Sequence, residues 1–291
     1  MMTSTGSDAW LRPLTAGPEP APTRAGQVVH AERRLGELVT GRPPGITGHQ
    51  WSSAIREAFA HVVCDAGTGL PVFAVAVVPP APAGSPQQRV ERATNAVCAA
   101  AGLPLLRIET STLRPAEHGR RIAEYVIDAR RYAVGVDADG EDAGTASVGF
   151  RDIVGRLPDG REGHVNDLGA LARAAAVQAY VGRDLADPIV RGLHVRWRGG
   201  PAEGWSWVEV RPGRCLVERV RITEQRFSCG VDGARLAEDL AAAAVGERLR
   251  DLTGVATDLT GRDELRGAIV ALRDRGDELV NGFAFAHLCA D

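Results

Sequence analysis

The stretch FAHVVCDAGTGLPVFAVAVV, residues 59–78, contains two short apolar runs separated by a polar turn. The segment Asp65–Gly69 between the runs is rich in Asp and Gly, which tolerate the backbone geometry of a hairpin turn. The second run, Val72–Val78, is apolar without interruption, as is typical of a strand buried on both faces of a sheet. The stretch therefore predicts a β-hairpin inside a covered sheet.

The residues that follow the hairpin predict a helix, a strand and a second helix. A Pro-rich breaker at 79–84 precedes a helical pattern from Gln87 to Ala101, which Gly102 closes because Gly adopts the left-handed conformation readily. The apolar run Leu103–Ile108 predicts a second buried strand, and residues 116–131 predict a helix.

The residues that precede the hairpin predict a helix and a disordered tail. We expect the helix from Gln27 to about Thr40, because apolar residues recur there on one helical face. The Pro-Pro-Gly sequence that follows would end it. Residues 1–26 are rich in Pro, Gly, Thr and Ala without apolar periodicity, and they predict a disordered tail.

The second half of the chain predicts an α+β, helix-rich domain of unassigned family. Residues 133–149 are small and acidic, so we interpret them as a linker between a domain at 28–131 and a domain at 150–291. The predicted elements are helices at 166–181, 234–249 and 262–275 and strands at 193–198, 205–211 and 215–221. In the second of these strands, Trp205, Trp207 and Glu209 share one face.

The composition excludes several classes of protein. All 34 basic residues of the 291 are Arg, so chemistry that needs a lysine is excluded: Schiff-base enzymes, P-loop NTPases and protein kinases. The richness in Ala, Arg, Gly and Pro indicates GC-rich codons and an actinobacterial source. The net charge of −3 gives no general attraction to nucleic acid or to anionic lipid.

Cysteine usage and hydropathy predict a cytoplasmic location. Five Cys without a CxxC spacing indicate reduced thiols and no structural zinc site. Neither a secretory signal nor an apolar run long enough for a membrane span is recognisable, so we expect no membrane partner.

Residues 28–130 resemble a bacterial family of unknown function, domain-of-unknown-function family number 2726. The resemblance is carried by Glu32–Leu35, by the hairpin of 59–78 and above all by the block AAAGLPLLRI at 99–108. It implies an α/β fold of the restriction-endonuclease-like, or PD-(D/E)xK, type, with a mixed sheet flanked by helices. In that fold two strand carboxylates hold Mg²⁺, which polarises the phosphodiester, and a lysine helps to activate water.

The sequence departs from this family at the catalytic positions. Ala60 and His61 stand where the family has an aspartate and an aromatic residue, and the Val75–Val78 segment, with Ala76, replaces the strand that carries its glutamate. No residue of the chain can take the lysine role. The resemblance therefore implies the fold and argues against the activity, so we assign no catalytic and no metal-binding residue.

Relocated carboxylates are the alternative that would restore an active, Mg²⁺-dependent nuclease. Asp65 and Glu91 are the candidates, but Asp is common in turns for conformational reasons and an exposed helical Glu is the ordinary expectation. His61 is more often a packed or surface histidine than a ligand at such a position. Cys64 and Cys98 carry no nucleophile signature, and buried inert thiols are expected there.

Nucleic-acid binding without cleavage is the third hypothesis. Arg196, Trp197, Arg198 and Trp205 interleave Arg with aromatic residues, a combination that can stack bases. Glutamates lie among them, and Trp in a small sheet usually belongs to a core. The main interpretation is thus a cytosolic, non-enzymatic structural or interaction module without cofactor. Its partner would be a protein or a nucleic acid.

Overall fold

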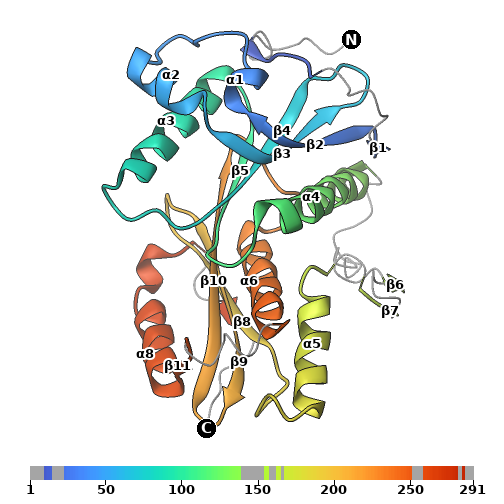
Figure 1. Cartoon of the computed structure of the whole chain (residues 1–291), viewed down its shortest axis with the longest axis vertical. Coiled ribbons are helices and arrows are strands. Elements are labelled where there is room, and N and C mark those ends of the chain that lie inside the picture. The colour runs from blue at the N-terminus through green and yellow to red at the C-terminus, as the bar shows by residue number, and fades with distance from the viewer. Residues whose placement is uncertain are drawn as a thin grey trace. The chain divides into compact units, whose positions relative to one another are not determined.

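The structure is a computed structural model that describes residues 10–14, 23–138, 154–156, 162–164, 167–250, 258–280 and 284–285, and it is a mixed α/β fold (Figure 1). Its contacts divide the chain into two compact units. The first comprises Met1–Asp139 and Thr223–Gly230, and the second comprises Gly140–Ile222 and Val231–Asp291.

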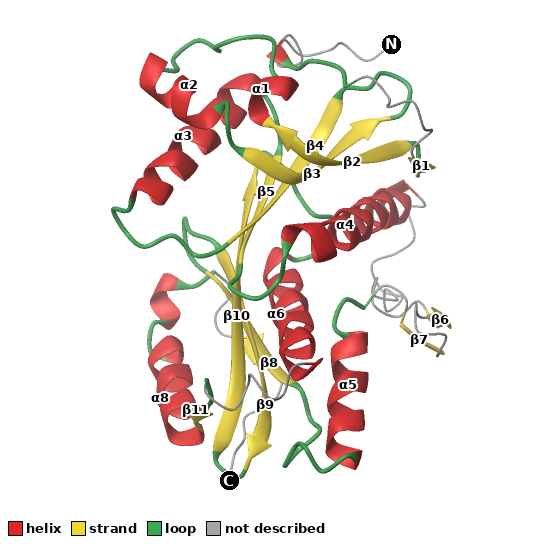
Figure 2. Ribbon diagram, in the orientation of Figure 1, coloured by secondary structure: helices red, strands yellow, loops and turns green. Residues whose placement is uncertain are grey.

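The first unit contains a mixed sheet in the strand order β1-β2-β3-β4-β5. The strands are β1 (Thr23–Arg24), β2 (Gln27–Arg34), β3 (Ala58–Asp65), β4 (Pro71–Val78) and β5 (Leu105–Glu109). The helices are α1 (Leu35–Leu38), α2 (Gly48–Ala54), α3 (Pro86–Ala101) and α4 (Pro115–Ala138). Figure 2 shows α1, α2 and α3 on one side of this sheet and α4 on the other.

The predicted hairpin is confirmed, and so are the helix and the buried strand predicted after it. β3 and β4 pair in antiparallel fashion, with Val62 opposite Ala74, and β4 pairs with β5 in parallel. The crossover helix α3 begins at the Ser85 cap, whose Oγ accepts a hydrogen bond of 3.1 Å from the Gln88 N–H. It ends at Gly102 with φ +76°, a conformation that favours glycine.

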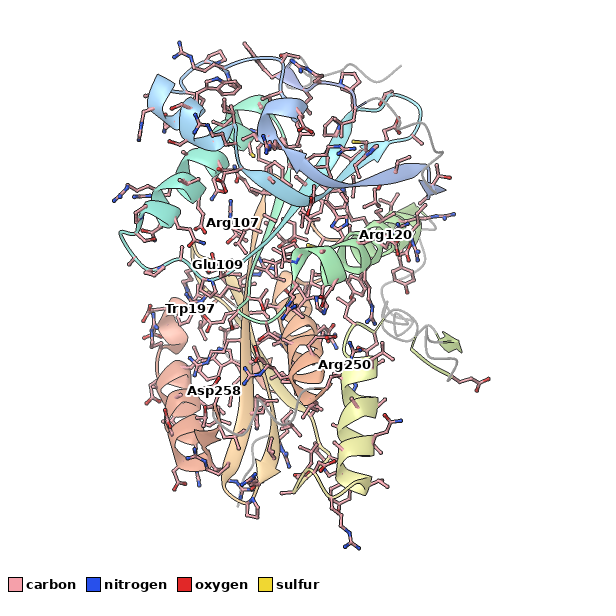
Figure 3. The ribbon with its side chains drawn as sticks, viewed as in Figure 1. Arg107, Glu109, Arg120, Trp197, Arg250 and Asp258 are labelled. Atoms are coloured by element: carbon pink, nitrogen blue, oxygen red, sulfur yellow. The ribbon has the colours of Figure 1, made fainter. Side chains whose placement is uncertain are left out.

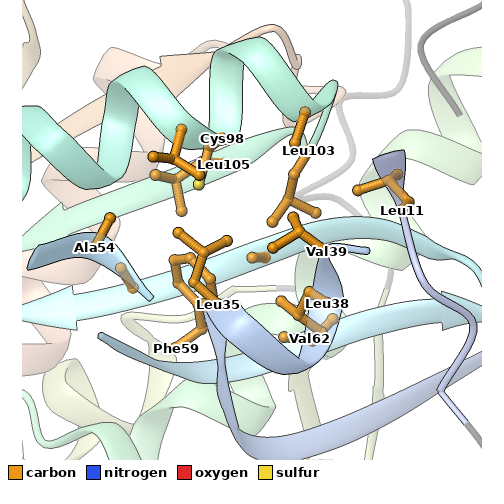
Figure 4. Close-up of a cluster of buried hydrophobic side chains, with 14 of the residues drawn as sticks. Leu11, Leu35, Leu38, Val39, Ala54, Phe59, Val62, Cys98, Leu103 and Leu105 are labelled. Carbon is orange, nitrogen blue, oxygen red and sulfur yellow. The ribbon is translucent and has the colours of Figure 1, made fainter. Parts of the chain in front are cut away.

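The core of the first unit lies between the sheet and helices α1, α2 and α3 (Figure 4). Phe59, Val62, Leu103 and Leu105 are buried there together with apolar residues of the three helices. Each buried Leu or Phe stabilises a fold by about 1.5–3 kcal/mol, so this cluster contributes substantially to the unit's stability.

The predicted helix at 27–40 is wrong. Residues Gln27–Arg34 form strand β2, paired with β3 from Gln27 opposite Asp65 to Arg34 opposite Ala58, and only the single turn α1 is helical. The spacing of apolar residues in this segment is compatible with either a helix or a strand. The segment becomes a strand because the edge of the β3–β4 hairpin offers it a full ladder of backbone hydrogen bonds.

The disordered tail predicted at 1–26 is also wrong in part. Leu11 is buried and forms a β-bridge with Val39, and the Arg12 N–H donates to the carbonyl of Leu38 at 2.8 Å. Residues 10–14 therefore form part of the fold because Leu11 fills the core and the backbone hydrogen bonds of the segment are satisfied. Residues 1–9 and 15–22 lie outside the described residues.

The second unit contains an antiparallel sheet in the order β10-β9-β8-β12, with β11 paired to β10. The strands are β8 (Arg191–Arg196), β9 (Ala202–Arg211), β10 (Arg214–Gln225), β11 (Thr260–Gly261) and β12 (Ala284–Phe285), and a separate pair joins β6 (Val154–Arg156) and β7 (Glu162–His164). The helices are α5 (Ala170–Val181), α6 (Gly233–Arg250), α8 (Arg262–Arg273) and the short 3-10 helix η3 (Gly276–Glu278). These elements confirm the three predicted helices of the second half and, with shifted ends, its three predicted strands.

Strand β9 is covered on both faces. Its Val208 and Val210 pack toward α5 and α6, whereas Trp205 and Trp207 pack toward Leu265, Ile269 and Leu272 of α8. Helix α6 approaches the strands very closely, because a Cβ atom on Gly204 would lie 2.1 Å from the Glu238 nitrogen. A glycine inside this strand thus marks a close approach of two backbones.

The predicted domain limits differ from the two units in two places. Helix α4 continues to Ala138, so the first residues of the predicted linker 133–149 are helical, and residues 139–149 lie outside the described part of the chain. Thr223–Gly230, assigned by sequence to the second domain, belongs to the first unit. There the Phe227 ring packs 4.8 Å from the Phe73 ring, and the Gln225 amide donates to the Asn95 carbonyl at 2.6 Å.

Candidate functional site

The two positions where the resemblance places metal-binding carboxylates are buried. Ala60 on β3 is 7% exposed and Ala76 on β4 is 3% exposed. Ala76 belongs to the apolar cluster beneath α3, and the Ala60 methyl lies close to Gly119 of α4, where a Cβ would approach it to 3.2 Å. Apolar side chains therefore occupy both positions without the cost of desolvating a carboxylate.

The neighbour of Ala76 on the next strand is a buried cation, which sequence reasoning missed. Arg107 lies opposite Ala76 in the parallel β4–β5 ladder and is 6% exposed (Figure 3). Its Nη2 donates to Asn95 Oδ1 at 2.9 Å, whereas its Nε is buried without a partner. Among the described residues no carboxylate forms an ion pair with Arg107. A single Arg inside the apolar run 103–108 was the available signal.

His61 is a buried imidazole wedged against α4. It is 5% exposed, and its Nδ1 has no hydrogen-bond partner. A Cβ on Gly119 would lie 2.6 Å from this Nδ1, so the glycine makes room for the ring. Burial lowers the pKa of His61, the nearby Arg120 lowers it further, and Glu124 and Glu32 partly offset the shift. The ring therefore stays neutral at pH 7, as a packed histidine does.

The candidate carboxylates Asp65 and Glu91 come from different elements, because Asp65 ends β3 at the turn into β4 and Glu91 lies on α3. Asp65 Oδ1 accepts hydrogen bonds from the N–H groups of Gly67 and Thr68 and from the Thr68 hydroxyl, and these bonds lower the pKa of Asp65. Glu91 accepts from Gln87, whose amide also reaches the Pro79 carbonyl just beyond the other end of β4. Asp65 is thus a turn-forming residue, and the pair does not converge on one cation.

The thiols of the first unit are not activated nucleophiles. Burial raises the pKa of Cys64 and of Cys98 to about 12, so both remain protonated at neutral pH. Cys215 and Cys229 are also buried, and Cys289 lies outside the described residues. The structure thus agrees with the expectation of inert thiols at Cys64 and Cys98.

In the second unit, Glu203 organises the Arg and Trp residues of the predicted nucleic-acid contact. Glu203 is 4% exposed, and its carboxylate accepts from Trp205 Nε1 at 2.7 Å, from Trp197 Nε1 at 3.1 Å and from Arg221 Nε at 3.2 Å. Arg221 lies directly opposite Glu203 on β10, so strand register brings the ion pair together.

The predicted contact residues do not form one open stacking surface. Trp205 is buried, and the Arg219 guanidinium covers its ring at 3.7 Å. Trp197, labelled in Figure 3, lies beneath the Arg275 guanidinium at 4.2 Å. Arg198 Nε donates to the Leu279 carbonyl at 2.9 Å. Burial of Trp205 agrees with the expectation that a Trp in a small sheet belongs to a core, and it counts against base stacking there, because α8 and the cross-strand neighbour Arg219 cover that face.

Arg196 faces the other side of the sheet. Its Nη2 donates to Asp232 Oδ1 at 3.1 Å, and Asp232 also accepts from the Ala234 N–H at the start of α6. Burial tends to raise the pKa of Asp232, but the bond from Ala234 and the charge of Arg196 outweigh it and lower that pKa. A role of Arg196, Trp197 and Arg198 in nucleic-acid binding stays a prediction.

Comparison with protein-family models, with curated proteins and with solved structures finds no match to this chain. Within the described ranges, none of the helices combines the length and the apolar character needed to cross a membrane.

Proposed function

We propose that this chain is a non-catalytic interaction protein in which a nuclease-like scaffold has lost its metal site. The observation that carries the proposal is the burial of Ala60 and Ala76, at 7% and 3% exposure, in the positions where the resemblance expects carboxylates. The β3–β4 hairpin followed by the α3 crossover to a parallel strand supports the same family of folds.

The positive charge of Arg107, beside Ala76, is a second observation against a metal site at this position. Hydrolysis of a phosphodiester by this type of site needs a divalent cation held by two carboxylates. Here the buried Arg107 lies next to Ala76 on the same face of the sheet, so a second cation would be repelled rather than held. Asp65 is engaged by the N–H groups of its own turn and Glu91 contacts Gln87 of its own helix, so they do not replace the missing ligands.

An interaction role is supported by apolar side chains on the surface of the second unit. Val177, Tyr180 and Val181 of α5 are 52%, 47% and 76% exposed, and Ile189 is 52% exposed. Apolar groups gathered on one exposed helix are more common at binding surfaces than elsewhere on a soluble protein. A cytosolic location remains our expectation from the five cysteines without a CxxC spacing.

The test is an assay of the full chain for cleavage and binding of nucleic acid. Labelled single- and double-stranded DNA and RNA are incubated with the protein and Mg²⁺ or Mn²⁺, and fluorescence anisotropy is read at low and at moderate salt. We expect no cleavage and no salt-sensitive rise in anisotropy. Metal-dependent cleavage that Asp65→Asn abolishes and Glu57→Gln preserves would overturn the proposal in favour of a relocated nuclease site.

Salt-sensitive binding without cleavage would instead favour the nucleic-acid hypothesis, since charge-driven binding weakens with added salt. In that case the variant Arg196→Ala/Arg198→Ala is compared with Arg183→Ala, which removes an exposed cation elsewhere in the unit. Selective loss of binding in the first variant would assign the contact to the predicted residues.

A further inference from the structure

Arg107 is a buried cation whose charge is not balanced by any described residue. Its side chain is 6% exposed, and its Nη2 donates to Asn95 Oδ1, an uncharged acceptor, at 2.9 Å. Its Nε is buried without a partner, and among the described residues no carboxylate forms an ion pair with it. An arginine stays protonated in proteins, so it cannot avoid the cost of burial by becoming neutral, as a buried Lys or His does. The guanidinium therefore lacks a counter-charge.

The nearest buried neighbours of Arg107 do not supply that counter-charge. Ala76 lies opposite it on β4 and is apolar. Burial raises the pKa of the Cys98 thiol to about 12, and the charge of Arg107 offsets only part of this rise. The thiol is therefore protonated and uncharged at neutral pH.

Arg107 lies where α/β proteins commonly bind ligands. Strands β4 and β5 run parallel and end two residues beyond Ala76 and Arg107. Ligands of open α/β sheets bind at the carboxyl ends of parallel strands. Asn95 on α3 is half-buried, so its hydrogen bond with Arg107 lies near the surface of the unit, and its amide nitrogen is a further donor beside the guanidinium.

We propose that Arg107 and Asn95 form a binding site for a small oxyanion, which carries a phosphate or a carboxylate group. A guanidinium donates to two oxygens of such a group at once, and the anion supplies the negative charge that the protein lacks at this place. Because Arg107 is only 6% exposed, the site accepts a small ion and not a polymer. The inference goes beyond the proposed interaction role and does not depend on it.

Two carboxylates limit the affinity of this site. Glu109, labelled with Arg107 in Figure 3, follows it on the same face of β5, and Glu91 lies one turn before Asn95 on α3. Both are half-buried, and neither forms an ion pair with Arg107. Because like charges repel, we expect a dissociation constant of about 1–10 mM.

Thermal unfolding of the full chain tests this proposal. It is measured in up to about 50 mM sodium phosphate or sodium acetate, with sodium chloride keeping the ionic strength constant. We expect the Tm to rise by about 2–4 °C and to level off, because an ion that binds only the folded state stabilises it. In chloride alone, Arg107→Met should unfold at a similar temperature to the wild type.

Arg107→Met should lose the part of the rise that levels off. Phosphate also stabilises proteins in general, because it is excluded from their surface, and this unsaturated part should remain in the variant. The difference between the two proteins therefore measures binding at Arg107.

A second variant keeps Arg107 and supplies the anion from within the chain. Ala76→Glu places a carboxylate opposite Arg107, so an added oxyanion should no longer raise the Tm in a saturable way. Ala74→Glu is the matched control, because its new carboxylate lies opposite Leu105, and it should keep the response.

Nitrogen-15 NMR of the arginine Nε–H groups observes the contact itself. The signal that is missing from the spectrum of Arg107→Met belongs to Arg107. In the wild type this signal should shift with added anion along the same saturation curve as the Tm. A response to phosphate alone assigns a phosphate ligand, and a response to acetate alone assigns a carboxylate ligand.

Two results would overturn the oxyanion site. One is an Arg107 Nε signal that does not move up to about 50 mM of either anion. The other is an equal rise of the Tm in the wild type, Arg107→Met and Ala76→Glu, which would mean that the anions act only through the general surface effect. Either result, obtained while the chain cleaves no nucleic acid, leaves the non-catalytic proposal intact. Metal-dependent cleavage would refute that proposal without changing the response of Arg107.

Discussion

In the second unit, β9 buries two carboxylates, and each has an arginine donor: Arg221 for Glu203 and Arg262 for Glu209. In the first unit, β3 buries His61 and β5 buries Arg107, and each side chain keeps a nitrogen without a partner. Both sheets are covered by helices on two faces, so burial alone does not distinguish them. The difference is that the buried carboxylates of β9 form ion pairs, whereas among the described residues His61 and Arg107 form none.

Removal of a buried polar side chain should therefore change the free energy of unfolding in opposite ways in the two units. A paired carboxylate stabilises its surroundings through the donors that depend on it, and its removal leaves those donors unsatisfied. An unpaired cation or imidazole costs free energy, and its removal relieves that cost. Substitutions in the two sheets should therefore change the free energy of unfolding with different signs and sizes.

The largest expected effect is that of Glu203→Ala. The change leaves the indole N–H groups of Trp197 and Trp205 and the Arg221 guanidinium without their acceptor in a buried site. We expect the free energy of unfolding to fall by about 3–5 kcal/mol, measured by urea denaturation. Glu203→Gln is the control, because its amide oxygen still accepts from one indole, and it should lose less. A loss below about 1 kcal/mol for Glu203→Ala would mean that the donors find water instead.

A second test places a carboxylate in the core of the first unit. Ala76→Glu should lower the free energy of unfolding by about 2–3 kcal/mol, because a buried carboxylate is desolvated and the space is filled. The neighbouring Arg107 offsets part of this cost by forming an ion pair with the new side chain. Ala74→Glu is the matched variant, since Ala74 lies on the same face opposite Leu105.

We expect Ala74→Glu to cost about 1–2 kcal/mol more than Ala76→Glu, because no cation lies opposite it. Equal losses for the two variants would show that Arg107 does not reach position 76. A neutral Ala76→Glu variant would mean that the position is open to water, and the sealed metal site would have to be abandoned.

The parts of this fold that the sequence predicted correctly are those determined within a few residues. The turn at Asp65–Gly69 and the helix ending at Gly102 depend on local backbone preferences, and both were predicted. Strand β2 was missed because its conformation depends on pairing with β3, which lies about 30 residues away and leaves no local signal.

In the candidate sites, too, only the features that depend on neighbouring residues in the sequence were predicted. The shared face of Trp205 and Trp207 follows from the two-residue period of a strand and was predicted. That α8 covers this face could not be predicted, because it depends on how a helix more than fifty residues later packs. The unpaired state of Arg107 was equally hidden, since a single Arg in an apolar run does not reveal what lies opposite it.

A third test removes the unpaired cation. Arg107→Met should leave the free energy of unfolding unchanged or raise it by up to about 1 kcal/mol, because an apolar side chain of similar length replaces a buried charge that has one hydrogen bond to Asn95. Chemical denaturation checks the result. The control is Arg248→Met in the second unit, whose guanidinium donates to the buried Glu218, and this variant should be destabilised. A loss of more than about 2 kcal/mol in Arg107→Met would contradict the contrast between the two sheets.

The smallest expected effect is the pH dependence contributed by His61. Burial lowers the pKa of His61 in the folded state, whereas in the unfolded chain it titrates near about 6.5. As the pH falls below about 6.5, the unfolded chain binds a proton that the folded protein resists, so the free energy of unfolding decreases until the pH reaches the lowered folded pKa.

Urea denaturation at pH values from about 7.5 to about 5.5 should therefore show a steeper loss of stability in the wild type than in His61→Gln, which cannot titrate. His30, whose pKa is also lowered by burial, acts in the same direction in both proteins and cancels in the difference. Equal slopes in the wild type and in His61→Gln would mean that the imidazole gains a proton acceptor or water in the folded state, and the unpaired character of the first sheet would then rest on Arg107 alone.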